Sequence, residues 1–374
     1  MINSFRVQNF KSLRDVSITF SPLTVMIGRS GVGKSSIVQA IRMLREALRS
    51  GEKGFAYRAE CLPATDRPSI EQVSYQFSFD APGHNGQFYY GARFQPQGKT
   101  GTISLASESL YQNQIPIFEQ TQGDWQSIPP FEPRPLGGQL ALFTLNSIDS
   151  VRVPYLTLSK GIGCFDFGGD VLISDTVGGI EYGLLDSGAN GVAAFDAIAN
   201  NLSTLSFVRE MVKALCRLNK SIVDVAIRNK KEILVTHQAT PTGKLITLPL
   251  WVESEGLRRF LAHLIAIYQQ PPMPVLIFEE PEKGIFPGAL AVLVDYFRLA
   301  ISRGAQVIVT THSPELLKHV HVDEIRVVTM PEFETIVGPV STEQREAINE
   351  HLLTTDELLN VDEARIDPAA PTQA

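Results

Sequence analysis

The chain has 374 residues, of which 44% are hydrophobic and 20% charged, so it can bury a sizeable core and is not disordered by composition. Its net charge of −7 argues against a generally basic coat for nucleic acid, and its 3 cysteines lack CxxC spacing, which excludes a disulfide scaffold and a cysteine-rich zinc site. No stretch reaches the roughly 20 apolar residues that span a bilayer and the first residues lack a signal-peptide core, so we expect a cytoplasmic protein without a membrane partner.

The first 50 residues predict strands, a glycine-rich loop and a helix. Residues 5–7, 16–20 and 23–27 are apolar or alternating, which is typical of strands, and residues 9–12 read as a turn. From Lys34 to about Leu48, apolar side chains recur at spacings of three and four, as on one face of a helix.

The loop between this strand and helix reads GRSGVGKS, an intact GxxxxGK[ST] phosphate loop. Glycines let backbone N–H groups turn inward around phosphate oxygens, and the following helix adds its positive N-terminal end. An ordinary glycine turn is the alternative, but the strand–loop–helix context favours a nucleotide site in which Lys34 reaches the β- and γ-phosphates and Ser35 binds Mg²⁺. The residues expected to bind the nucleotide here are Gly28, Arg29, Ser30, Gly31, Val32, Gly33, Lys34, Ser35 and Ser36.

The middle of the chain changes character. Residues 73–79 alternate strictly and residues 88–94 and 102–105 continue the strand pattern, which predicts a small antiparallel sheet. The Pro/Gly-rich residues 121–138 predict a surface loop, and residues 193–218 a helical stretch. Further strands are expected at 222–227, 233–236 and 245–250.

From Ser254 onward, helix and strand patterns alternate, which predicts a parallel sheet. Residues 341–360 are expected to form two short helices, and the last dozen residues to be loose. The charge of this end is strongly acidic, with eight acids and two bases in residues 341–374.

Two basic clusters invite a nucleic-acid interpretation. Arg42, Arg45 and Arg49 form a helical stripe, and residues 228–231 hold three basic side chains on a turn between strands. We expect both to be solvated surface, because charges on a helix face or turn are more often solvated than bound.

The apolar strand 275–278 ends on Glu279 and Glu280. Beside a phosphate loop, the first acid of such a pair commonly helps to hold Mg²⁺ and the second polarises the attacking water. We therefore predict Glu279 as a metal ligand and Glu280 as the catalytic base. The alternative is a buried strand that simply reaches solvent at an acidic turn.

Two further places are candidates for phosphate contact. Ser254 and Gly256 open a helix, where a hydroxyl caps and a bare backbone can approach an anion, although a capped core helix would look the same. His312 ends the apolar strand 307–311, so its imidazole can hydrogen-bond a terminal phosphate or merely satisfy a loop carbonyl.

In this order and spacing, the motifs resemble those of an ABC-type ATPase head, and more closely those of AAA-family ATPases with SMC/RecF-like heads. The family has an N-terminal NF(K/R)S turn, an LSxGxxR signature, a DEPExGLHP segment and a THSPELL segment. The matching segments are residues 9–13, 254–258, 278–287 and 311–317. Glu253, Glu279 and Phe286 depart from the family's Leu, Asp and His.

The resemblance implies an α/β P-loop NTPase head with a mixed, mostly parallel central sheet, an antiparallel β lobe and a helical insert. It implies a homodimer that sandwiches two ATP molecules, in which Ser254 and Gly256 touch the γ-phosphate held by the partner's Lys34. Residues 281–286 would form the D-loop at the dimer seam, and Lys11 and Ser12 would lie near the nucleotide. No glutamine near residues 139–165 stands out as that of a Q-loop.

We expect one head over residues 1–340 and acidic helices with a tail over 341–374. Within the head, residues 1–150 would be the N-terminal lobe with the phosphate loop, 151–250 a helical and β insert, and 251–340 the C-terminal lobe with the signature, the acidic strand and His312.

The function that follows is an ATP-hydrolysing switch, with Glu280, His312 and Lys34 as catalytic residues and ATP and Mg²⁺ as cofactors. Its cargo, an effector protein or nucleic acid, is not identified by the sequence; DNA repair or phage defence follows by family analogy alone. An assembly module with little turnover is the alternative. A transporter subunit is disfavoured by the 251 residues from Gly28 to Glu279, and a G protein by the lack of an NKxD motif.

Overall fold

The computed structural model describes residues 1–50, 72–81, 86–97, 102–121, 124–127, 139–173, 183–239 and 242–367. It divides the chain into two compact units. Unit 1 comprises Met1–Ile162, Asp323–Glu350 and Ala364–Ala374, and unit 2 comprises Gly163–Val322 and His351–Glu363. The predicted three-part division of residues 1–340 stays a prediction. Most of the surface loop expected at 121–138 lies outside the described residues.

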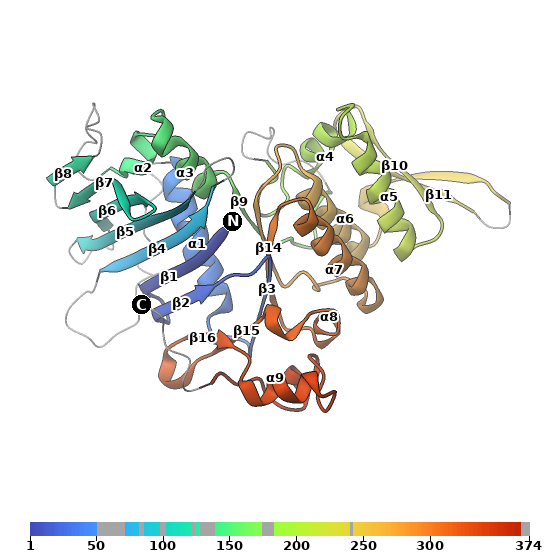
Figure 1. Cartoon of the computed structure of the whole chain (residues 1–374). Helices are drawn as coiled ribbons and strands as arrows, with labels where there is room; N and C mark the ends of the chain where they lie inside the picture. The colour runs from blue at the N-terminus through green and yellow to red at the C-terminus, as the bar shows by residue number, and fades with distance from the viewer. Residues whose placement is uncertain are drawn as a thin grey trace. The chain divides into compact units, whose positions relative to one another are not determined.

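Unit 1 contains the predicted antiparallel sheet, which is larger than expected. Seven strands run in the order β2-β1-β4-β5-β6-β7-β8 (Figure 1). They are β1 (Ile2–Phe10), β2 (Leu13–Thr19), β4 (Val73–Asp80), β5 (Gln87–Gln97), β6 (Thr102–Gln112), β7 (Ile115–Thr121) and β8 (Asp124–Ser127). Alternation buries one row of aromatic side chains, and cross-strand pairs such as Phe5 with Phe77 (4.6 Å between ring centroids) stabilise the pairing.

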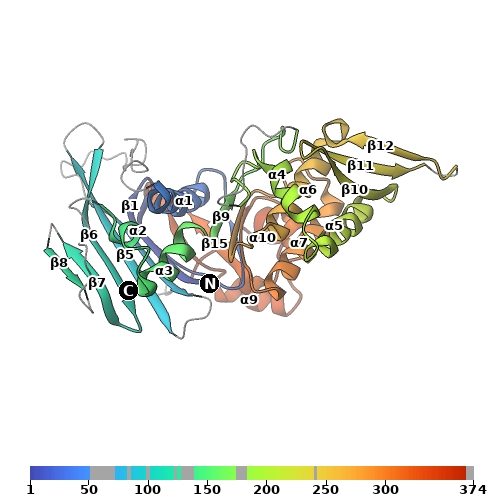
Figure 2. The same ribbon diagram turned by 90° about the horizontal axis from the view of Figure 1, so that it is seen from above.

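Three helices lie beside this sheet: α1 (Lys34–Ser50), α2 (Ala141–Thr144) and α3 (Asp149–Ser159) (Figures 1 and 2). The arginine stripe of α1 was predicted to be solvated, and this is wrong for two of its members. Arg45 is 3% exposed and donates from Nη1 to the carbonyl of Ile162 (3.1 Å), and Arg49 donates from Nε to the carbonyl of Ser159 (2.6 Å). Arg49 ties α1 to the C-terminal end of α3, because a guanidinium can satisfy a carbonyl that a helix end leaves open, and Arg45 ties α1 to Ile162, three residues beyond that helix.

A second sheet segment of unit 1 carries the phosphate loop. The buried strand β3 (Leu23–Ile27) pairs in parallel with β15 (Ile325–Thr329), which pairs antiparallel with β16 (Ile336–Pro339). The short 3₁₀ turn η6 (Pro331–Phe333) joins the last two strands. The last dozen residues were expected to be loose, but Ala364 is buried and the Arg365 carbonyl accepts from the Ser341 N–H at the start of α9 (Thr342–Asn349).

Unit 2 begins at the second residue of β9 (Ile162–Phe165) and continues with a helical region that the sequence predicted as one stretch. It is two helices, α4 (Gly191–Ala199) and α5 (Leu205–Leu218), because the mostly polar residues 200–204 interrupt the apolar periodicity. The three predicted strands are confirmed as one antiparallel sheet of β10 (Ile222–Arg228), β11 (Glu232–Gln238) and β12 (Leu245–Pro249). The basic turn at residues 228–231 is exposed, as predicted.

The predicted alternation after Ser254 is confirmed as well. In order, the elements are α6 (Glu255–Tyr268), β13 (Val275–Glu279), α7 (Pro287–Ser302), β14 (Gln306–Thr311), α8 (Pro314–Leu317) and, in unit 1, β15. Strands β13 and β14 pair in parallel, and α4 to α7 lie side by side in both views (Figures 1 and 2). Three short elements complete the structure: η4 (Leu250–Val252), η5 (Val322–Glu324) and α10 (Glu357–Asn360). The fold is α/β, with parallel and antiparallel strands and helices.

Candidate functional site

The phosphate loop lies in unit 1 between the C-terminal end of β3 and the first turn of α1. Gly33 has φ +107, in the region that only glycine enters without strain, and a Cβ there would lie 2.2 Å from Thr335 Oγ1. A Cβ on Gly28 would meet the Val328 carbonyl at 2.1 Å. Gly28 and Gly33 therefore have no room for a side chain, because Val328 and Thr335 pack directly against them. A Cβ on Gly31 would meet no atom within 4 Å.

Lys34 is 4% exposed, and its ammonium lies at the loop itself. Nζ donates to the carbonyls of Gly28 (2.7 Å) and Arg29 (2.9 Å). Ser30, Gly31 and Ser35 are exposed around it. A buried ammonium beside an exposed glycine-rich loop and a helix N-terminus is a chemical environment for a phosphate, so these residues fit the nucleotide predicted for them.

Thr335 is a site residue that sequence reasoning missed. Its hydroxyl donates to the Val32 carbonyl (2.9 Å) and accepts from Ser12 Oγ (2.8 Å), and its N–H donates to the Ser12 carbonyl (2.9 Å). The structure thus brings the predicted Ser12 to the phosphate loop through a residue about 300 positions later. No local pattern marks Thr335, because its role depends on chain segments far apart in sequence.

Lys11 occupies the same turn between β1 and β2. Its backbone has φ +52, and its ammonium donates to Oε1 of Gln39 on α1. Lys11 is therefore attached to the helix that follows the phosphate loop, which agrees with its predicted place beside the nucleotide but does not test its role.

The acidic pair lies in unit 2 at the end of β13. Glu279 is partly exposed, and Glu280 turns out of the strand with φ +45. The Glu280 carboxylate has Oε1 3.7 Å from Nε2 of His312 and Oε2 3.0 Å from Nζ of Lys283. The hydrogen bond to Glu280 raises the pKa of Lys283 above its ordinary value. The predicted base and the predicted phosphate-sensing histidine are therefore neighbours.

Glu282 is the second site residue that the motif search did not single out. Its Oε1 accepts from Thr311 Oγ1 (2.7 Å) and from the backbone N–H of His312 (2.9 Å). Its Oε2 is buried and accepts no hydrogen bond among the described residues. The carboxylate thus fixes the turn that presents His312.

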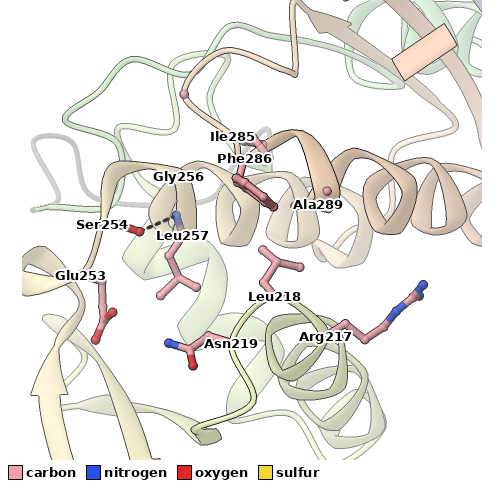
Figure 3. Close-up of a pocket in the computed structure, with 12 residues that line it drawn as sticks. Arg217, Leu218, Asn219, Glu253, Ser254, Gly256, Leu257, Ile285, Phe286 and Ala289 are labelled. Atoms are coloured by element: carbon pink, nitrogen blue, oxygen red, sulfur yellow. Dashed lines mark hydrogen bonds between the residues drawn. The ribbon is translucent and has the colours of Figure 1, made fainter. Parts of the chain in front are cut away.

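Ser254 and Gly256 lie at the N-terminus of α6 on a pocket of about 460 Å³ (Figure 3). Ser254 is exposed, and its Oγ accepts from the Leu257 N–H (3.3 Å), which makes it the helix cap as predicted. A Cβ on Gly256 would lie 2.6 Å from the Gly284 carbonyl, so the bare backbone lets the helix start pack on the turn over residues 284–286. Phe286, at the end of that turn, is 76% exposed.

The polar edge of this pocket holds Glu253, where the resembling family has Leu. Its Oε1 is 2.8 Å from Nε2 of His237, whose Nδ1 is 2.8 Å from Ser221 Oγ. The side chains of His237 and Glu253 are 17% and 12% exposed. The carboxylate is therefore tied to the β10–β12 sheet.

The predicted residues fall into two groups, each described within its own unit. The phosphate loop, Lys11 and Ser12 belong to unit 1, and Ser254, Gly256, Glu279, Glu280 and His312 belong to unit 2. In the described part of the chain, no group of three or more His, Cys, Asp or Glu is placed to hold a metal ion. The predicted pair Ser35 and Glu279 contains only one residue of those types, so this finding does not test it. None of the described helices combines the length and apolarity needed to cross a membrane.

Comparisons with known proteins concern the domains and the fold. Residues 1–70 match a family described as "AAA ATPase domain", and residues 189–318 match one described as "AAA domain, putative AbiEii toxin, Type IV TA system". Two separate parts of the chain thus match AAA-family domain models. A search of the curated proteins found no match.

Similar solved structures are SMC head domains. One, described as an SmcHead bound to the C-winged helix domain of ScpA, has TM-score 0.58 and 18% identity over 92% of this chain and 99% of that one. The head from Thermotoga maritima has TM-score 0.51 and 16% identity (91% and 99% covered), and the head from Pyrococcus furiosus 0.54 and 15% (94% and 99%). The fold is that of an SMC-type ATPase head.

Proposed function

We propose that this protein is an ATP-hydrolysing switch that closes into a homodimer around two ATP molecules. Each phosphate loop would receive Ser254 and Gly256 from the partner protomer. The observation that carries the proposal is the pocket of unit 2, where these two residues and the turn ending at Phe286 share one open surface. A ligand closes a dimer only by binding the closed form more tightly, and shared γ-phosphate contacts would supply that difference.

The first half of the site would bind the triphosphate. The loop N–H groups and Lys34 would hold the phosphates, while Ser35 and Glu279 offer oxygen ligands of the kind that Mg²⁺ prefers. When bound, the metal would neutralise charge on the phosphates. Its ligands here are proposals from the donor chemistry of these two side chains.

The second half would position and activate water. Glu280 is the proposed base, and His312, whose Nε2 lies 3.7 Å from the Glu280 carboxylate, would contact the terminal phosphate. Glu282 would keep His312 in place through its two hydrogen bonds.

The test is Glu280→Gln. The variant should bind ATP as the wild type does, lose turnover by at least about a hundredfold, and accumulate as a dimer with ATP in size-exclusion chromatography with light scattering. Asp224→Asn, which changes an exposed acid on β10, is the matched control, since it leaves the proposed base and the turn that carries His312 in place. Unchanged hydrolysis in Glu280→Gln would remove that residue from the role of base.

One observation favours the alternative of an assembly module with little turnover. The Lys283 ammonium holds Oε2 of Glu280 at 3.0 Å, so the proposed base is engaged within its own protomer. Under the alternative, the wild-type protein forms the ATP-bound dimer but releases phosphate only at the background rate. Lys283→Met, which frees the Glu280 carboxylate, then raises the rate of phosphate release. Under the main proposal, the wild-type dimer hydrolyses ATP without that substitution.

A further inference from the structure

Phe333 is a large aromatic side chain that the proposed function does not use. It is 89% exposed in unit 1, although phenylalanine is among the residues most often buried. A single exposed apolar residue needs no explanation by itself, so its backbone and surroundings decide whether this one carries a function.

The backbone of Phe333 is held in an unusual conformation. Glu332 has φ +52 and Phe333 has φ +63, both in the left-handed region that bulky side chains rarely enter. The Glu334 N–H donates to the Pro331 carbonyl (2.9 Å), which closes the turn. Such conformations persist where the surrounding structure fixes them, and they concentrate at binding sites.

What fixes this turn is the phosphate loop. We call residues 328–335 the strap. At one end, the Val328 carbonyl abuts Gly28, and at the other end Thr335 bonds to the Val32 carbonyl. Phe333 is two residues from Thr335, so its Cα lies within about 7 Å of the Cα of Thr335, the residue whose hydroxyl contacts the loop.

The charges around the ring select the kind of ligand. Glu332 and Glu334 flank Phe333 and are exposed. Among the residues that the structure describes, an ion pair is formed by Glu334 alone of these two, with Arg14 at 3.7 Å. Two carboxylates disfavour a phosphate or a nucleic-acid backbone at this place, but they do not disfavour a neutral planar ring. Every nucleobase has a π-face that stacks on an aromatic side chain.

We propose that Phe333 stacks on the base of the nucleotide whose phosphates bind the loop Gly28–Ser36. This rests on the nucleotide-binding part of the proposed function and adds a base-contacting residue to it. Stacking tolerates different bases, so the strap would contribute affinity for nucleotides in general and little choice among them.

The test compares ATP with inorganic tripolyphosphate, which has the phosphates but no base, by calorimetry at a concentration where the protein is monomeric. Phe333→Ala should weaken ATP binding about tenfold and leave tripolyphosphate binding unchanged, and Phe333→Trp should restore ATP binding. Ile115→Ala, which truncates another exposed apolar side chain of unit 1, should change neither.

Equal ATP affinity in the wild type and Phe333→Ala would overturn the inference and leave the proposed function intact. So would an equal loss for ATP and tripolyphosphate, which would mean that the ring only positions the loop. Normal ATP affinity with a lost dimer would make Phe333 an interface residue instead. Failure of the wild type to bind either ligand would reject nucleotide binding itself.

Discussion

At the residue scale, the proposed chemistry depends on two carboxylates, Glu280 and Glu282, that contact different groups. Glu280 leaves its strand with a positive φ and sits between His312 and Lys283, whereas Glu282 turns back and bonds to the histidine turn. In the proposed mechanism, Glu280 is the base and Glu282, two residues later, positions His312.

In the proposed mechanism Glu282 acts through His312. We therefore predict that Glu282→Ala lowers kcat about tenfold with little change in KM, because the turn that carries His312 loses its two hydrogen bonds to the Glu282 carboxylate. Steady-state phosphate release measures both constants. Asp224→Ala, an exposed acid on β10, is the control and should be silent.

The double variant Glu282→Ala with His312→Ala should be no slower than His312→Ala alone, since a positioning residue has nothing left to position. Additive losses in this cycle would show that Glu282 acts independently of the histidine.

At the element scale, the strap explains why the phosphate loop has its shape. Thr335 supplies a hydroxyl to the Val32 carbonyl and receives one from Ser12, so three segments meet at one side chain. Thr335→Val removes these bonds at nearly constant volume.

We expect Thr335→Val to weaken ATP and tripolyphosphate binding equally, by about three- to tenfold, because it loosens the loop and does not touch the base. Thr19→Val, an exposed threonine on β2, is the matched control. Titration calorimetry with both ligands decides, and a loss confined to ATP would contradict the prediction.

The helix α2 is held to the antiparallel sheet by Glu108, a buried carboxylate on β6. Glu108 accepts four hydrogen bonds, from Tyr90 Oη (2.8 Å), Leu142 N (3.0 Å), Gln120 Nε2 (2.8 Å) and Ala141 N (2.5 Å). The two backbone donors, Ala141 and Leu142, are the first residues of α2, so Glu108 joins the sheet to that helix. Burial outweighs these bonds and raises the pKa of Glu108 from 4.5 to about 7.

The raised pKa predicts a stability loss as pH rises. Between about pH 4.5 and 7 the folded chain keeps a proton on Glu108 that the unfolded chain has released, so the free energy of unfolding falls through this window. The expected loss is on the order of 3 kcal/mol, and Glu108→Gln should lack it.

Fluorescence of Trp125, which stacks on Phe118 at 5.5 Å, reports on this sheet in a Trp251→Phe background. Denaturant titrations at pH 5 and pH 7.5 compare the two proteins. Parallel pH dependence in the wild type and Glu108→Gln would assign the loss to other groups.

At the scale of the whole molecule, the predicted residues are divided between two compact units, and the proposal assigns each complete site to two protomers. Such sharing has a consequence that no single-chain site has: two variants that are inactive for different reasons can complement each other.

Lys34→Ala removes the ammonium proposed to hold the phosphates, and Ser254→Arg blocks the pocket at the N-terminus of α6. Each protein alone should be inactive. Mixed in equal amounts, they should recover up to about a quarter of wild-type turnover, since half the dimers are mixed and each has one intact site. Recovery in a coupled ATPase assay, with Ser254→Ala as a milder control for folding, supports shared sites; a mixture that stays inactive argues that each protomer works alone.

The sequence predicts features formed by neighbouring residues better than contacts between segments that are far apart in the chain. The phosphate loop, the strand ending on Glu279 and the cap at Ser254 were predictable because each depends on residues that are neighbours in the chain. Strand alternation and helix periodicity likewise follow from geometry within one element. The order and spacing of these motifs along the chain then indicated the family resemblance.

Contacts between distant segments were not predictable in this way. Arg45 reads as a solvated charge on its helix face, and packing against residue 162 makes it a buried donor. Thr335 and Glu108 have no motif, because their partners lie far away in the chain and in other elements. Short sequence patterns determine turns, helix caps and loops, because the residues involved are neighbours in the chain. The burial of a side chain and its hydrogen bonds to distant residues depend on which segments the folded backbone brings within a few ångströms.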